Sequence, residues 1–315
     1  MADAAILATL EVAALRRVPA LARLGLVSEV FPLGLGLRED VQAAIGVDVA
    51  LDLDRVSVFA RRPEGGGDEW LVVARGRFPD DVVARVAAGI GGSVETVSDR
   101  PLLRAKKGSL VLASAPDGAV LAGTPALVEP RLSNDWKPGR RPAGALTVPA
   151  GLVGLAASTQ WLRQDGGRLA TDLAGGFTHA SLSIDDTGLE WTLGAKDLAH
   201  LERARLASEG LLALLRAGHP AARGAARVIA AVAESFLGAD TVADAAISRA
   251  AELLSLVDAL SGDGTFESTL DVNKRTKRVT ARAQGAALTD VVAAGGVVPL
   301  LGLLGAFRRV AERAR

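Results

Sequence analysis

Three aspartates in the first third of the chain are the strongest candidates for acid–base chemistry or cation binding. Asp48, Asp52 and Asp54 precede a run of alternating apolar residues. If that run is extended from its start, Asp52 and Asp54 share one strand face. Two carboxylates on one face can hold a cation or exchange a proton. The run lacks the spacing and glycine pivot of an EF-hand, so a hydrated start of a strand is the favoured interpretation.

The other residue types that could do chemistry form no known motif. The chain has no Cys, and His179, His200 and His219 are not spaced as a compact metal site. No phosphate-binding loop and no nucleophile elbow occurs. The sequence therefore predicts no catalytic residue, no metal site and no cofactor, and it identifies no cofactor-binding residues. Enzyme activity is the less favoured hypothesis.

The charges are balanced, with 36 basic and 36 acidic residues. Together with 3% aromatic residues, this balance disfavours nucleic acid as a partner. Two basic clusters, at residues 104–107 and 274–278, fall at expected hairpin turns or strand ends. Such charges keep turns hydrated and strand edges unpaired; contact with an anionic membrane surface is the alternative.

The fold is expected to contain two related halves. Residues 53–78 and 180–193 both alternate with period two around a turn, and both carry Glu-Trp on the second strand. Each is followed by a helix start, at Pro79 and at Asp197. Each half also ends in a hairpin, near residues 110–121 and 266–284. We therefore expect an α+β fold of two antiparallel-sheet halves with helices packed on one face.

The expected boundaries follow from turn-rich composition. Residues 1–132 form the first half, 133–143 a linker, and 144–315 the second half. The second half carries a helical insertion at about 198–261 and a C-terminal helix. Because its apolar residues recur at helical spacing, we expect the insertion to pack in the core. A flap over an apolar pocket is the alternative.

The uncharged stretch 291–307 raises the question of a membrane anchor. As a helix its seventeen residues would span about 26 Å, which is short for a bilayer, and Pro299 interrupts it. A docked terminal helix, or an amphipathic element touching a membrane surface, is favoured over a spanning segment. The candidate residues for an apolar pocket or for docking are Leu211, Leu215, Phe236, Leu300, Leu303, Leu304 and Phe307.

This layout resembles uncharacterised exported proteins of high-GC bacteria built from repeated strand–helix–hairpin units. The excess of 30 Arg over 6 Lys fits a high-GC genome. Residues 1–5 look like the start of a mature exported chain with an added Met, which suggests a periplasmic or envelope location; a cytoplasmic one is the alternative. The expected function is non-enzymatic extracytoplasmic binding, with a lipid-like apolar ligand or a membrane surface as partner. A protein-interaction scaffold and an enzyme with an Asp/Arg/His site remain open.

Overall fold

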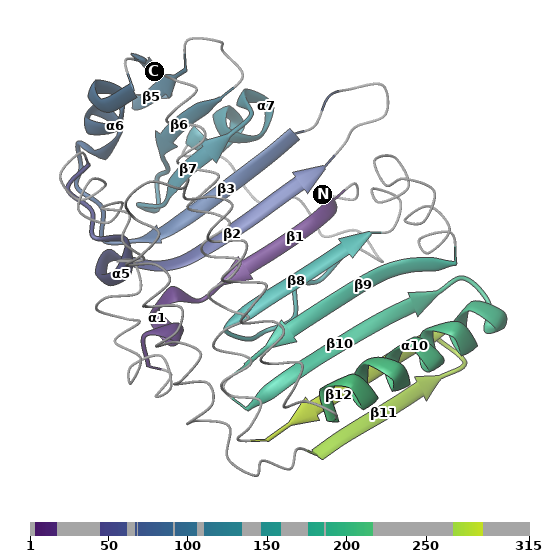
Figure 1. Cartoon of the computed structure of the whole chain (residues 1–315). Helices are drawn as coiled ribbons and strands as arrows, with labels where there is room; N and C mark the ends of the chain where they lie inside the picture. Colours follow the sequence, from purple (N-terminus) through teal and green to yellow (C-terminus); the bar gives the residue numbers. More distant parts are fainter. Residues whose placement is uncertain are drawn as a thin grey trace, which may run out of the picture.

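The computed structural model describes residues 4–17, 45–61, 67, 69–90, 92–105, 110–133, 146–158, 176–185, 187–216 and 267–285. Twelve strands in these ranges form one antiparallel sheet (Figure 1). The strands are β1 (Ala4–Leu10), β2 (Leu53–Arg61), β3 (Glu69–Gly76), β4 (Ser93–Val97), β5 (Arg100–Arg104), β6 (Val111–Ser114), β7 (Val120–Gly123), β8 (Val153–Ser158), β9 (Phe177–Ile184), β10 (Gly188–Ala195), β11 (Glu267–Asn273) and β12 (Arg278–Gln284). The helices are α1 (Val12–Leu15), α5 (Val49–Asp52), α6 (Val82–Ile90), α7 (Pro125–Val128), the 3₁₀ turn η1 (Glu129–Leu132) and α10 (Leu198–Arg216).

The strand order places β1 inside the sheet, between β2 and β8. Across the whole sheet the order is β11-β12-β10-β9-β8-β1-β2-β3-β7-β6-β5-β4. From β1 the chain passes outward through β2 and β3 to α6. It then adds β4–β7, with β4 at the edge of the sheet and β7 beside β3. Outward from β8 it runs through β9 and β10 to α10 and then to β11–β12. The two sides therefore add strands in a similar sequence, although they share one sheet rather than forming two.

On the side that begins with β2, helices cover both faces of the sheet. Leu102 and Leu103 are neighbours on β5, so their side chains point to opposite faces, and both are buried. Leu102 packs in a cluster with Leu127 of α7, whereas Leu103 packs with Val83 of α6. The expectation that helices lie on one face only is wrong for this side.

On the side that begins with β8, the described helix α10 covers one face of the sheet. The stripe of α10 that meets the sheet has helical spacing and consists of Leu201, Ala204, Ser208 and Leu212. It packs on Val279, Ala281 and Ala283, which alternate along β12. The alternate residues of these strands, such as Thr192 and Arg282, point to the opposite face and are polar. Period-two alternation thus separates an apolar face from a polar one.

The hairpins predicted from local alternation are present. They are β2–β3, β9–β10, β6–β7 and β11–β12, and the predicted helices after Pro79 and Asp197 are α6 and α10. A fold of antiparallel sheet with helices is therefore confirmed at this level. The strands β4 and β5 were not predicted. Ser93–Val97 is largely exposed and lacks an alternating apolar pattern.

The segments 217–266 and 286–315 lie outside the described residues. Most of the predicted helical insertion and the whole uncharged stretch 291–307 fall there. Among the helices that the structure describes, none combines the length and the apolar character needed to cross a bilayer.

We expect Ser208→Ala to lower the free energy of unfolding by about 1–3 kcal/mol, because it leaves a buried donor without a partner. The indole Nε1 of Trp191 on β10 donates to Ser208 Oγ over 3.1 Å, and both residues are buried. Urea unfolding monitored by Trp fluorescence measures the change. Gly210→Ala is the matched control on the same helix. No atom lies within 4 Å of the added methyl, so it should stabilise by roughly 0.5–1 kcal/mol. A neutral Ser208→Ala would contradict this packing.

Candidate functional site

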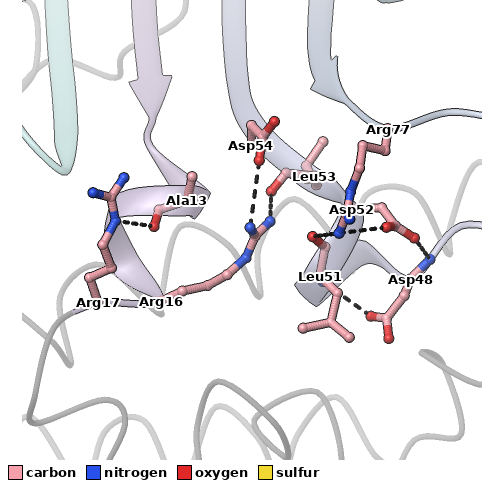
Figure 2. A network of polar contacts seen from close by, with 9 residues as sticks. All are labelled: Ala13, Arg16, Arg17, Asp48, Leu51, Asp52, Leu53, Asp54 and Arg77. Carbon is pink, nitrogen blue, oxygen red and sulfur yellow. Dashed lines mark hydrogen bonds and ion pairs between the residues drawn. The ribbon is translucent and has the colours of Figure 1, made fainter.

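The three aspartates lie around one short helix and not along one strand (Figure 2). Asp48 precedes α5, Asp52 is its last residue, and Asp54 follows on β2. The prediction that Asp52 and Asp54 share a strand face is therefore wrong. The chain makes a helical turn through Asp52 before it extends, so the period-two argument does not apply to that residue.

The first two carboxylates close the helical turn. Asp48 is buried, and its Oδ1 accepts a hydrogen bond from the backbone N–H of Leu51 over 3.3 Å. In return, Asp52 Oδ2 accepts the backbone N–H of Asp48 over 2.9 Å. This exchange resembles a capping box, in which two side chains satisfy backbone donors at a helix start. The acids thus have a local structural explanation.

Two arginines form ion pairs with Asp52 and Asp54. The guanidinium of Arg77 lies 3.1 Å from Asp52 Oδ1 and donates to the carbonyl of Leu51 over 2.9 Å. Arg16, just after α1, lies 3.5 Å from Asp54 Oδ1 and donates to the carbonyl of Leu53. Figure 2 shows the two arginines approaching from opposite sides of this segment. The network ties α1, α5 and β2 to the residue after β3.

Backbone contacts also hold Gly76 and Arg77 against the end of α5. A Cβ on Gly76 would lie 2.0 Å from the carbonyl oxygen of Asp52, so only glycine fits there. The N–H of Arg77 donates to that oxygen over 2.8 Å. The carboxylates are therefore held apart by hydrogen bonds and ion pairs to other groups. In the described part of the chain, no group of three His, Asp or Glu residues could hold a metal ion.

The histidines are not assembled into one site with these acids. His200 lies on α10, and its Nδ1 lies 2.8 Å from Asp197, which also accepts the backbone N–H of His200. The latter bond is the main cause of the lowered pKa of Asp197. His179 lies on β9 against Gly194 of β10. His219 lies outside the described residues.

A group of exposed cations gathers where two loops meet. We name Lys196, Lys274, Arg275 and Lys277 the basic end; all four are exposed. Lys277 Nζ donates to the carbonyl of Lys196 over 2.8 Å, and the Lys277 carbonyl accepts the N–H of Ala195 over 2.8 Å. The turn between β11 and β12 therefore lies against the loop that leads into α10. The cations of the turn are visible in the sequence, but their neighbour Lys196 is not, because 81 residues separate Lys196 from Lys277.

The second basic cluster differs in its partners. Arg104 forms ion pairs with Glu95 over 2.6 Å and with Glu129 over 2.8 Å. The hydrogen bond to Glu129 is the largest cause of its raised pKa. Lys106 and Lys107 lie outside the described residues. Arg104 is thus part of a salt-bridge network that joins β4, β5 and η1.

Two of the candidate apolar residues lie within the described ranges. Leu211 is on α10, outside the stripe that packs on the sheet, and is 43% exposed. Leu215 also belongs to α10. Phe236, Leu300, Leu303, Leu304 and Phe307 lie outside the described residues, so the pocket stays a prediction.

Comparison with known proteins gives no relative for this chain. No protein-family model, no curated protein and no solved structure matches it. The function is therefore argued from the residues alone.

If Asp48 and Asp52 serve structure, their removal lowers stability. We expect Asp48→Ala and Asp52→Ala each to cost roughly 0.5–2 kcal/mol, the usual loss for a helix cap. Asp54→Ala is the matched control and should stay within about 0.5 kcal/mol, because its ion pair is exposed. Thermal unfolding of the three variants measures these losses of stability. Repeating it with added Mg²⁺ or Ca²⁺ tests whether the acids bind a cation. A midpoint that rises with either ion, and does not rise in Asp52→Ala, would instead make these acids a cation site.

Proposed function

We propose that the protein is a non-enzymatic binding protein of the bacterial envelope that associates with an anionic membrane surface through its basic end. The observation that carries the proposal is the grouping of Lys196, Lys274, Arg275 and Lys277 at one end of the sheet, all exposed. This local excess occurs in a chain whose formal net charge is zero. A concentrated patch, and not an overall field, is what a surface contact requires.

The magnitude of the attraction is sufficient for reversible association. Each Lys or Arg close to an anionic leaflet contributes about 1 kcal/mol, so four contribute a few kcal/mol. That is weaker than stable anchoring, which takes a second signal. Nearby acids reduce the total: Asp197 follows Lys196, and Lys274 acts on Glu202, although the lowered pKa of Glu202 is due mainly to its hydrogen bond with Arg205. The attraction is expected to weaken with salt.

A lipid-like apolar ligand is the second part of this proposal. Leu206 and Leu211 are 54% and 43% exposed on α10, away from the face that packs on the sheet. These are among the exposed apolar side chains of α10 that such a ligand would contact. Mass spectrometry of an organic extract of the purified protein would identify such a ligand. An extract free of lipid from protein made in its native envelope counts against this part.

We also propose that the two sides of the sheet arose from one duplicated unit. Glu69-Trp70 lies on β3 and Glu190-Trp191 on β10, which are the third strands of the runs β1-β2-β3 and β8-β9-β10. A helix follows each of these strands.

The acids Asp48 and Asp52, which were the best catalytic candidates, cap a helix, and this favours binding over acid–base catalysis.

Vesicle co-sedimentation at low salt tests the membrane contact. Wild-type protein should bind phosphatidylglycerol vesicles and not phosphatidylcholine vesicles. Removing two charges in K274Q/R275Q should weaken binding roughly thirtyfold, as expected for the loss of about 2 kcal/mol.

The matched control is R17Q/R85Q, which makes the same change in net charge. Arg17 and Arg85 are exposed on the side that begins with β2. Arg17 follows α1, at the opposite end of the strands from the basic end (Figure 1). This variant should bind within twofold of wild type. Equal losses in both variants, or equal binding to both kinds of vesicle, would refute the proposal.

A further inference from the structure

On the polar face of the sheet, close to the basic end, a glycine lies between a histidine and an arginine. The strand register places Ser158, His179, Gly194 and Arg278 in one row across β8, β9, β10 and β12. Residues opposite each other in register point to the same face. Gly194 has no side chain, so no side chain of β10 stands between His179 and Arg278 in this row. Strands lie about 4.8 Å apart, so roughly 10 Å separates the backbones that carry these two cationic residue types.

The imidazole of His179 lies over Gly194. A Cβ at that position would be 2.1 Å from His179 Cε1 and 2.3 Å from Nδ1, so any larger residue would displace the ring. The register shifts at this point, where Ala195 pairs with Phe177 and Gly194 with His179. Such a bulge leaves Thr178 as the extra residue. Bulges re-aim side chains and are common beside binding sites.

The hydrogen bonds of the ring leave one nitrogen for a ligand. Thr178 Oγ1 lies 3.0 Å from His179 Nδ1. When the hydroxyl donates to Nδ1, the neutral ring carries its proton on Nε2. No described residue hydrogen-bonds Nε2, and no carboxylate in the described ranges pairs with the exposed Arg278. Two donors on this face of the sheet therefore lack an acidic partner among the described residues.

We propose that His179 and Arg278, on either side of Gly194, form a binding site for a phosphate-type oxyanion. Arg278 supplies a planar fork of donors that suits phosphate oxygens, and His179 supplies the N–H of Nε2. The hydroxyl of Ser158 is next in the same row. This site goes beyond the membrane contact proposed above, because it involves none of the four residues of the basic end.

The titration of His179 makes the site responsive to pH. Burial lowers the pKa of its imidazole, and the nearby Arg278 lowers the pKa further. On the adjacent strands the residues in register are Ser158 and Gly194, neither of which is charged. On α10, His200 lies beside Gly176 with its Nδ1 held by Asp197. A bound oxyanion adds negative charge next to the ring, so it should raise the pKa of His179 and bind more tightly as pH falls.

NMR of the imidazole groups tests the proposal, with the three His assigned by His→Gln variants. Adding inorganic phosphate, against sodium chloride at equal ionic strength, should shift the His179 signals saturably and raise the pKa of its imidazole. The His200 signals should not shift when phosphate is added. In Arg278→Gln the pKa of His179 should rise without phosphate, because a neighbouring cation is lost, and the response to phosphate should disappear. Arg278 is exposed, so this variant should fold.

Two further samples separate a soluble anion from a lipid headgroup. K274Q/R275Q, which should not hold vesicles, still responds to inorganic phosphate if the site takes the soluble ion. A response of wild type to phosphatidylglycerol vesicles but not to inorganic phosphate assigns the site to the headgroup. The proposal is overturned if neither source changes the His179 titration, if His200 shifts equally, or if Arg278→Gln responds like wild type. Vesicle binding can fail while the phosphate response persists, so the two proposals are tested independently.

Discussion

The pairing of β1 with β8 is the interaction on which the architecture depends. β1 is the first strand of the chain, yet it lies inside the sheet, and Ile6–Leu10 pairs with residues 153–157 on one side and with β2 on the other. Close approach constrains this contact. A Cβ on Gly154 would lie 2.5 Å from the carbonyl oxygen of Pro149 and 2.9 Å from Thr9 Oγ1. Glycine at 154 thus allows the two sides of the sheet to join.

The buried core extends across the pairing of β1 with β8. One buried cluster contains Leu10 and Val56 together with Val153 and Ile184, so it continues across the contact between the sides. Burial of apolar surface contributes about 25 cal/mol per Å², and a shared cluster couples the stability of both sides. The pairing also links residues more than 140 positions apart, from Leu7 to Ala156. Such non-local contacts slow folding, because the loop must close before the contact is made.

Local patterns explain what could be predicted from the sequence. Alternation around short turns identified β2–β3, β9–β10 and β11–β12, because each hairpin pairs neighbouring segments. The join of β1 to β8 carries no local signal, and the exposed edge strand β4 lacks alternation. At the candidate sites, the turn cations were visible, but Lys196 beside Lys277 and Gly194 between His179 and Arg278 arise from pairing across strands. Asp52 does not follow the alternation expected of an extended strand, because it ends α5, a single helical turn that the local pattern does not reveal.

Hydrogen exchange of the β1 amides tests the central claim most directly. Residues 6–10 are paired on both sides, so their amides should exchange only when the whole sheet unfolds, as slowly as those of Val72 and Trp191 in β3 and β10. Destabilisation by denaturant should accelerate all three strands together. Rapid exchange of Leu7–Thr9, while β3 and β10 stay protected, would show that β1 does not join the two sides and would contradict the account.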